Sequence, residues 1–530
     1  MSISHDAQMV QPSTGAVGSA EPLDPASIGR RVAKGAAWMV ALRVAFRAIS
    51  VVSQLILVRL LSPTDFGLVA GASVIYGMLG TLSELSTALA LMQMSNPQRQ
   101  DYDTAWTLGV LRGAVIGVML WLIAPLMGDY MRDPRVTDIV HVLAVAPVVS
   151  AFASVGLITL QRRLEFGRLF LYQLLGKVVA FLIAVAIAII YRNYWALVFG
   201  GFAAQFLTVP LSYAFAPHRP AFSLASARAL LSFSKWLFVN NALTMLDVSL
   251  MTLTLGRLNG VRDVGLYQVS YDLAALPASE VAAPIRGPMY AGYARVADDP
   301  AALRQQVLTG FALLVMVVLP MSIGIATTSD YVVHVALGAQ WTDAAPIVTL
   351  CALYTLFDAI GHFTGGIYIA RHAQRPYVAI MAVSLLIRVL LVVPAAMLGG
   401  VLAAVAAIAL SALINAVLWF AYLRRLIQVD WSDLAHVTWR SGAATAMMAA
   451  CVIAAQMLWP RSDALTAMIL QWAVLCGGGA VVHIGCQLLL WRAAGMPAGP
   501  EMQVVGMLPA LLARVGLELR PWPREAPAKS

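Results

Sequence analysis

The chain has 530 residues, of which 60% are hydrophobic and only 12% are charged. Water-soluble domains carry charges at about a quarter of their positions, so this composition excludes an ordinary soluble protein. The mean hydropathy is +0.79, and apolar blocks reach the roughly 20 residues that cross about 30 Å of hydrocarbon. Because backbone polar groups cannot stay unpaired in lipid, the blocks are expected to be α-helices.

The formal net charge of +9 is spread between the apolar blocks. This distribution favours contact with anionic membrane lipids over binding of nucleic acid. The four cysteines lie in apolar segments without the spacing of metal ligands, so neither a metal nor a cofactor is expected. The N-terminal residues lack the basic start and short apolar stretch of a secretory signal, and no cleaved leader is expected.

The hydropathy pattern predicts an all-α membrane protein with about 14 transmembrane helices and both termini in the cytoplasm. Residues 1–33 are expected to form a disordered cytoplasmic tail. The helices are expected near residues 36–58, 66–91, 104–128, 137–160, 169–190, 194–216, 231–256, 264–285, 305–327, 344–370, 377–398, 400–423, 437–458 and 464–491.

Residues 493–530 are expected to form a second cytoplasmic tail. Apolar residues recur there at helical spacing, which is typical of an amphipathic helix lying on the membrane surface. They are Val504, Leu508, Leu511, Leu512 and Val515.

The Lys and Arg residues support this topology. With the N-terminus inside, 18 of them fall on the inner side and 7 on the outer side, as the positive-inside rule requires. One miscounted helix in the middle would destroy this excess of basic residues on the inner side. A pair of helices added or removed would leave it intact, so twelve helices also fit. The inner residues are Arg30, Arg31, Lys34, Arg99, Arg162, Arg163, Arg168, Arg219, Arg228, Lys235, Arg286, Arg295, Arg304, Arg371, Arg375, Arg424, Arg425 and Arg440, and the outer ones are Arg59, Arg132, Arg135, Arg192, Arg257, Arg262 and Arg461.

A short motif after the first helix recurs 198 residues later. The residues Arg59, Leu60, Asp65, Gly67 and Leu68 match Arg257, Leu258, Asp263, Gly265 and Leu266, and Trp38 matches Trp236 in the same register. Both copies follow the first helix of a six-helix block, which predicts two halves related by an axis along the membrane normal. The expected domains are an N-lobe of helices 1–6 (residues 34–218), a C-lobe of helices 7–12 (219–430) and helices 13–14 (431–492).

Four motifs lie at the ends of predicted helices. They read I-L-V-R-L-L-S-P-T-D-F-G-L-V-A (56–70), L-Q-R-R-L-E-F (160–166), A-P-I-R-G-P-M-Y-A-G-Y-A-R (283–295) and L-G-A-Q-W-T-D-A-A-P (337–346). With them, residues 30–490 resemble bacterial polysaccharide transporters, the lipid-linked oligosaccharide flippases of the multidrug/oligosaccharidyl-lipid/polysaccharide (MOP) exporter superfamily.

The resemblance implies a V-shaped fold of two lobes in the bacterial inner membrane. It also implies a function: moving an undecaprenyl-pyrophosphate-linked repeat unit from the cytoplasmic to the periplasmic leaflet, for exopolysaccharide, O-antigen or capsule synthesis. A polymerase and a chain-length regulator of the same pathway would be the protein partners.

Polar residues in the first helix are the leading candidates for substrate binding. Arg43, Arg47, Ser50 and Gln54 fall on one helical face, and Arg47 lies roughly 20 Å along the helix from Lys34. Two guanidiniums one turn apart suit a pyrophosphate, whose oxygens match their forked donors. Alternatively, Arg43 extends to the inner headgroups and Arg47 pairs with an acid such as Glu84.

Two further residues in the first half carry charge inside predicted helices, where a charge is functional by default. Glu84 is either the counter-ion of Arg47 or a titrating group for proton coupling. Lys177 either reaches the cavity as a substrate ligand or extends to the inner headgroups.

The second half carries acids and amides instead. Asn240, Thr244 and Asp247 share one face of helix 7, so that Asn240 could bind sugar hydroxyls. Asp247 could bind H⁺ or Na⁺, or pair with an Arg. Asp358 and His362 are four residues apart and can touch; with Arg388 they form either a structural cluster, which we favour, or an ion-coupling site.

Three other functions fit the sequence less well than polysaccharide transport. A membrane-embedded polymerase or ligase needs catalytic groups on large outer loops, whereas the outer connections here are expected to be short, the longest lying around residues 128–136. No residue is assigned a catalytic role. A cation-coupled multidrug antiporter would favour an acidic lumen, and a peptidoglycan-precursor flippase would share the fold; the motifs favour polysaccharide.

Overall fold

The computed structural model describes residues 25–83, 91–92, 94, 97–227, 235–282, 287, 289–290, 292–293, 295–371, 373–462, 464–497 and 499–502. Over these ranges the chain is helical and contains no β-strand, which confirms the predicted fold class. Ten of the described helices are long and apolar enough to cross a membrane.

The first lobe contains counterparts of predicted helices 1–6. They are α1 (Pro25–Leu60), α2 (Pro63–Leu82), α4 (Arg99–Met131), α5 (Pro134–Ala151), α7 (Phe166–Tyr191) and α8 (Trp195–Phe215), with the short α6 (Gly156–Arg162) before α7. One expectation is wrong in part: α1 begins at Pro25, so residues 25–33 of the expected tail belong to the first helix. Proline suits a helix start because the first turn needs no N–H from it.

The second lobe and the last helix pair follow the same order. They comprise α10 (Lys235–Leu258), α11 (Val261–Ala274), α13 (Pro300–Thr327), α15 (Ala345–His362), α17 (Gln374–Ile427), α18 (Trp431–Leu458) and α19 (Leu465–Ala493). The 54-residue α17 is two helices joined at a kink, where Gly400 has a φ of 65°. Each of the fourteen predicted helices therefore has a counterpart among the described residues.

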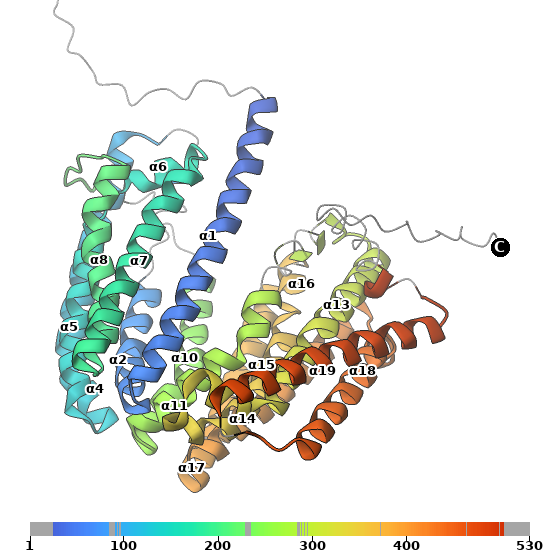
Figure 1. Ribbon diagram of the computed structural model, residues 1–530. Coiled ribbons are helices and arrows are strands. Elements are labelled where there is room, and N and C mark those ends of the chain that lie inside the picture. Colours follow the sequence, from blue (N-terminus) through green and yellow to red (C-terminus); the bar gives the residue numbers. More distant parts are fainter. Residues whose placement is uncertain are drawn as a thin grey trace, which may run out of the picture.

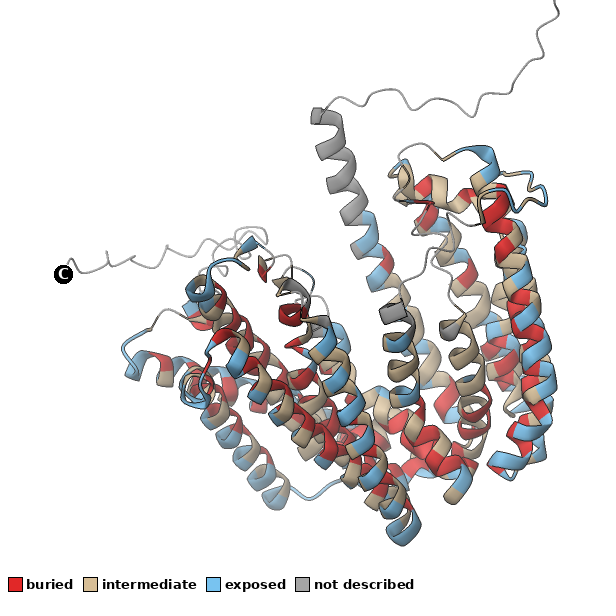
Figure 2. Cartoon of the chain, turned by 180° about the vertical axis from the view of Figure 1, so that it is seen from behind, coloured by how far each residue is buried: buried red, intermediate tan, exposed pale blue. Residues whose placement is uncertain are grey.

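The two lobes form a V (Figure 1). They splay apart at the end where α1 begins, which we call the open end, and meet at the opposite end, the closed end, where α2 packs on α11. Buried residues are dense at the closed end, and exposed ones cover the outer faces of both lobes (Figure 2). In a membrane these outer faces lie against lipid.

One connection at the closed end is longer than expected. Between α13 and α15 the chain forms α14 (Ser329–Val332), the π-helix η2 (Val333–Leu337) and the 3-10 helix η3 (Ala339–Ala344). The expectation that all connections on this side are short, with 128–136 the longest, is therefore wrong. The apolar and aromatic residues of this segment pack into the protein: Trp341 is fully buried.

The described part of the C-terminal tail does not extend freely from α19. Glu501 is buried against Arg440 of α18, with Nε–Oε1 at 2.8 Å. The amphipathic helix predicted around residues 504–515 lies outside the described residues.

Candidate functional site

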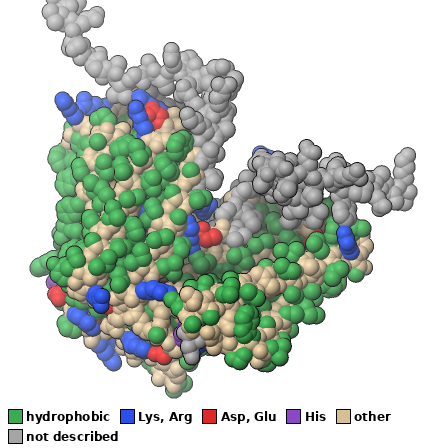
Figure 3. Space-filling model, viewed as in Figure 1, with side chains coloured by type: hydrophobic (Ala, Val, Ile, Leu, Met, Phe, Trp, Pro, Cys, Tyr) green, Lys and Arg blue, Asp and Glu red, His purple; other side chains and the backbone are tan. Residues whose placement is uncertain are grey.

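The surface is hollowed between the lobes toward the open end, and basic and acidic side chains lie side by side there (Figure 3). Arg47 of α1 faces the second lobe, because its guanidinium pairs with Glu280 of the π-helix η1 (Pro277–Ala282) at 3.3 Å. Both side chains are a little over one-third exposed. The wall between the lobes therefore holds a charge pair that is open to an incoming ligand.

The partner of Arg47 differs from the one expected. The sequence suggested Glu84 on the next helix, but the described partner is Glu280, from the other lobe. Glu84 itself lies outside the described residues. A pairing across 233 positions (280 − 47) leaves no local spacing signal, so only the three-dimensional arrangement could reveal it.

A second acid of the second lobe was also missed. Asp272 on α11 accepts a hydrogen bond from the Gln268 amide at 3.1 Å and interacts electrostatically with Arg47. The signal was an acid inside a predicted span, which is functional by default. Together, Asp272 and Glu280 give the second lobe an acidic wall opposite the arginines of α1.

The other predicted substrate ligands are partly accessible. Arg43 is exposed one turn before Arg47, and Gln54 and Lys177 are partly buried on α1 and α7. Asn240 is partly buried on α10, where its backbone carbonyl accepts a bond from the Thr244 hydroxyl at 2.8 Å. Their role in substrate binding stays a prediction.

The expected charge cluster of the second lobe is present and includes Asp247. The Arg388 guanidinium binds Asp247 at 2.6 Å and Asp358 at 3.5 Å, and His362 lies 3.5 Å from Asp358. The Arg388 side chain is only 4% exposed and lies over the Tyr354 ring, 5.5 Å from its centroid. The cluster thus ties α10, α15 and α17 together through one buried cation.

A small cavity of about 30 Å³ adjoins this cluster, and it has room for a water molecule. The Ser384 hydroxyl and the Asn415 carbonyl oxygen line it, and neither has a hydrogen-bond partner among the described residues, although both are buried. Unsatisfied buried groups are costly, so a small polar ligand or water would stabilise this site. Within the described residues, no group of three His, Cys, Asp or Glu side chains could hold a metal ion.

A larger cavity, which sequence reasoning missed, lies between α13, α18 and α19. It measures about 660 Å³ and is lined mainly by apolar residues such as Met316, Val452 and Leu475. A few polar groups interrupt it, among them His483 and Gln487. The apolar lining suits an apolar molecule such as a lipid chain.

Residues 56–346 match the family described as polysaccharide biosynthesis protein. The lipopolysaccharide biosynthesis protein WzxC of Escherichia coli K12 is 24% identical over 65% of this chain and 71% of its own length. The succinoglycan biosynthesis transport protein ExoT of Rhizobium meliloti is 20% identical over 62% and 67%, respectively.

Solved structures show the fold alone at these identities. The lipid II flippase MurJ, in an inward closed conformation, superposes with a TM-score of 0.68 at 11% identity, over 86% of this chain and 99% of its own. An inward-facing multidrug transporter of the MOP superfamily gives 0.51 at 14% identity, over 72% and 94%. The family match and the two relatives confirm the expected family and superfamily, and the solved structures confirm the expected fold. The chain belongs to the polysaccharide biosynthesis protein family and is a multi-pass membrane transporter of the MOP superfamily, not an enzyme.

Proposed function

We propose that the protein flips an undecaprenyl-pyrophosphate-linked oligosaccharide repeat unit across the bacterial inner membrane, from the cytoplasmic to the periplasmic leaflet. The observation that carries the proposal is the accessible Arg47 on the wall between the lobes, with Arg43 one turn away. Paired guanidiniums suit a pyrophosphate. The relatives named for polysaccharide biosynthesis and transport support the substrate class.

The orientation follows from charge. The Lys and Arg residues assigned to the inner side, such as Arg163, Arg219 and Arg424, belong to the open end, while Arg59, Arg132 and Arg257 belong to the closed end. By the positive-inside rule, this distribution supports a cytoplasmic location for the open end and both termini. In this state the space between the lobes would receive substrate from the inner leaflet.

Glu280 would act as a resident anion that the substrate displaces. In the absence of substrate it neutralises Arg47 at 3.3 Å; a pyrophosphate carries more charge and more acceptor oxygens than one carboxylate. Because Glu280 belongs to the second lobe, displacing it would remove a contact between the lobes.

A cation gradient would supply direction. The candidates are Glu84 and the cluster of Asp247, Asp358 and His362, of which the cluster holds two carboxylates against one buried guanidinium. The remaining negative charge favours H⁺ or Na⁺ as the coupling ion. A polymerase and a chain-length regulator would receive the exported unit.

One alternative substrate has an observation in its favour. The likeness in fold to the lipid II flippase MurJ fits a peptidoglycan precursor, which also carries a polar group on a lipid. Rescue of cells depleted of their own lipid II flippase would favour that substrate, whereas restoration of surface polysaccharide alone would favour the repeat unit. The multidrug alternative also has a likeness in fold, but the basic side chains on α1 would repel cationic drugs.

The test is polysaccharide export in a bacterium whose surface polysaccharide depends on this gene. Arg47→Ala removes a charged contact worth about 1.5–3 kcal/mol, so export at limiting substrate should fall roughly 10- to 100-fold. Export by Arg47→Lys should lie between that of the wild type and that of Arg47→Ala, because lysine keeps the charge but loses the forked pair of donors. Arg43→Ala should also reduce export.

Glu280→Gln separates substrate binding from a structural ion pair. If Arg47 only held the lobes together, Glu280→Gln would impair export as much as Arg47→Ala. The proposal expects Glu280→Gln to keep export near the wild-type level, because Arg47 is then unopposed. Arg168→Ala is the matched control, since Arg168 is exposed at the open end and pairs with Glu165 of its own lobe. Normal export by well-expressed Arg43→Ala and Arg47→Ala variants would refute the proposal that these two arginines, the cationic site, bind the substrate.

A further inference from the structure

The repeated motif meets its own second copy at the closed end. Gly67 on α2 and Gly265 on α11 pack against each other's helices so tightly that a side chain would not fit. A Cβ on Gly67 would lie 1.6 Å from the Val261 carbonyl oxygen, and a Cβ on Gly265 would lie 1.8 Å from that of Pro63. Both pairs differ by 198 (265 − 67 and 261 − 63), so the contact has the symmetry of the repeat.

The repeated arginines, Arg59 and Arg257, also each contact the opposite lobe. Arg59, at the end of α1 in the first lobe, donates to the Val335 carbonyl of η2 in the second lobe. Arg257, at the end of α10 in the second lobe, lies 3.4 Å from the Asp129 carbonyl oxygen of α4 in the first. It also lies over the Tyr130 ring, 5.7 Å from its centroid. Each arginine therefore contacts backbone carbonyls of the opposite lobe at the closed end.

A third contact is made by the Q-W pair of the motif at 337–346. The Gln340 amide donates to the Val58 and Leu61 carbonyls at 2.7 and 3.0 Å, and the Trp341 indole donates to Val58 at 2.9 Å. These are carbonyls at the end of α1, which have no partner within the helix. The long connection of the second lobe thus caps the first helix of the other lobe.

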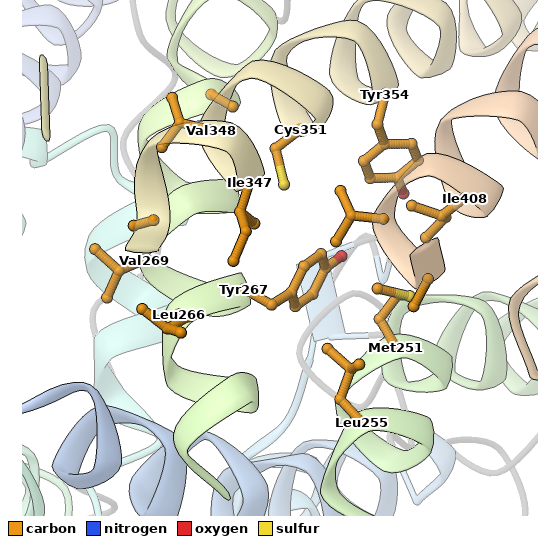
Figure 4. Packing of buried hydrophobic residues seen from close by; sticks show 14 of the residues in the cluster. Met251, Leu255, Leu266, Tyr267, Val269, Ile347, Val348, Cys351, Tyr354 and Ile408 are labelled. Atoms are coloured by element: carbon orange, nitrogen blue, oxygen red, sulfur yellow. The ribbon is translucent and has the colours of Figure 1, made fainter. Parts of the chain in front are cut away.

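The hydrophobic core continues through this contact. Val58 of α1 is fully buried in a cluster whose other fully or largely buried members belong to the second lobe, including Leu266 and Trp341. Tyr267 of α11 and Cys351 of α15 belong to the same cluster and point into its packed interior (Figure 4). Val58 can therefore reach water only if the lobes separate here.

We infer that the repeated motif is a two-fold lock on the closed end, in which the glycines set the crossing of α2 and α11 and the arginines hold each lobe to the other. The inference rests on the proposed function, with alternating access as its mechanism: the two lobes rock so that the cavity opens first to one side and then to the other. The lock must open for the cavity to reach the other side. It assigns the duplication a physical role: one motif, present twice, contacts itself across the axis that relates the lobes.

The first test introduces methyl groups into the crossing. Gly67→Ala and Gly265→Ala each place a Cβ against a backbone carbonyl, so the lobes must part. The reporter is Val58→Cys in a chain whose four native cysteines are replaced by Ala. The measurement is the rate of its reaction with a water-soluble maleimide in detergent-purified, monodisperse protein. Either glycine variant should raise the rate at least threefold over Gly77→Ala, a control in α2 with nothing within 4 Å of the added methyl.

The second test avoids steric strain and covers the case in which a glycine variant does not fold. Arg59→Gln and Arg257→Gln should each raise the Val58→Cys reaction rate, and the double variant should raise it further. Arg135→Gln is the matched control, because Arg135 lies at the same end but pairs within its own lobe, with Asp133 at 2.7 Å.

The outcomes separate the lock from the transported substrate. Reaction rates in the arginine variants equal to that of Arg135→Gln would overturn the lock. A faster reaction together with normal complementation of a lipid II flippase, and none of polysaccharide export, would overturn the proposed substrate and leave the lock in place.

Discussion

At the scale of single residues, two arginines of the lobes, Arg388 and Arg47, differ in how far their side chains are exposed, and we expect different roles for them. The Arg388 side chain is 4% exposed and pairs with two carboxylates within its own lobe, whereas the Arg47 side chain is 36% exposed and, among the described residues, pairs with Glu280 of the other lobe. Pairing one cation with two acids inside a lobe favours rigidity. The more open pair is the one that a ligand can replace.

Removing Arg388 should destabilise the protein. Arg388→Ala leaves Asp247 and Asp358 uncompensated in a buried site, which lowers the free energy of unfolding by roughly 3–5 kcal/mol. Thermal unfolding of the purified protein in detergent measures this. Arg262→Ala is the control, since its pair with Asp343 is 52% and 66% exposed and is worth less than about 1 kcal/mol. Equal melting temperatures for the two variants would contradict the role of the cluster.

Single residues also show what sequence could and could not predict. Asp358 and His362 were expected to touch because four residues make one helical turn. The Arg47–Glu280 pair could not be predicted, because it depends on how two lobes lean on one another. Asp272 was within reach of sequence reasoning, as an acid in an apolar segment, and was missed.

At the scale of elements, the kink in α17 decides how two spanning helices connect. Gly400 combines a φ of 65° with a ψ of −155°, a region that essentially only glycine adopts. Without it the 54 residues would continue as one straight helix far longer than a membrane is thick. The sequence predicted a break between residues 398 and 400, because two apolar blocks meet there.

A side chain at this kink should be poorly tolerated. We predict that Gly400→Ala lowers the free energy of unfolding by about 1–3 kcal/mol through backbone strain, again measured by thermal unfolding in detergent. Gly442→Ala, within α18 and with nothing near the added methyl, should be neutral or slightly stabilising. A Gly400→Ala variant as stable as Gly442→Ala would show that the kink tolerates a side chain.

At the scale of the whole molecule, the helix order and the duplication could be predicted from the sequence, because bilayer thickness fixes span length and a repeated motif fixes the halves. The contact between the two motif copies could not be predicted, because a repeat in the sequence indicates symmetry but does not show which residues touch. The length of the connection at 328–344 was misjudged, because the helices expected at 305–327 and 344–370 already leave 16 residues between them.

The proposed topology predicts the activity of reporter proteins fused at either end of the V. Alkaline phosphatase is active only outside the cytoplasm, so a fusion after Asp133 at the closed end should be active and one after Arg163 at the open end inactive. Green fluorescent protein fused after Ser530 should fluoresce, as expected in the cytoplasm. The reverse pattern would show that the V opens toward the periplasm.

The most direct test of the cationic site is binding of undecaprenyl pyrophosphate to the purified protein. Native mass spectrometry or a filter assay with labelled lipid can measure it. The Arg43→Ala/Arg47→Ala double variant should bind at least about tenfold more weakly than the wild type, Glu280→Gln should bind as tightly or more tightly, and undecaprenol without phosphates should not distinguish the proteins. Equal affinity of the double variant and the wild type for the pyrophosphate lipid would contradict the account.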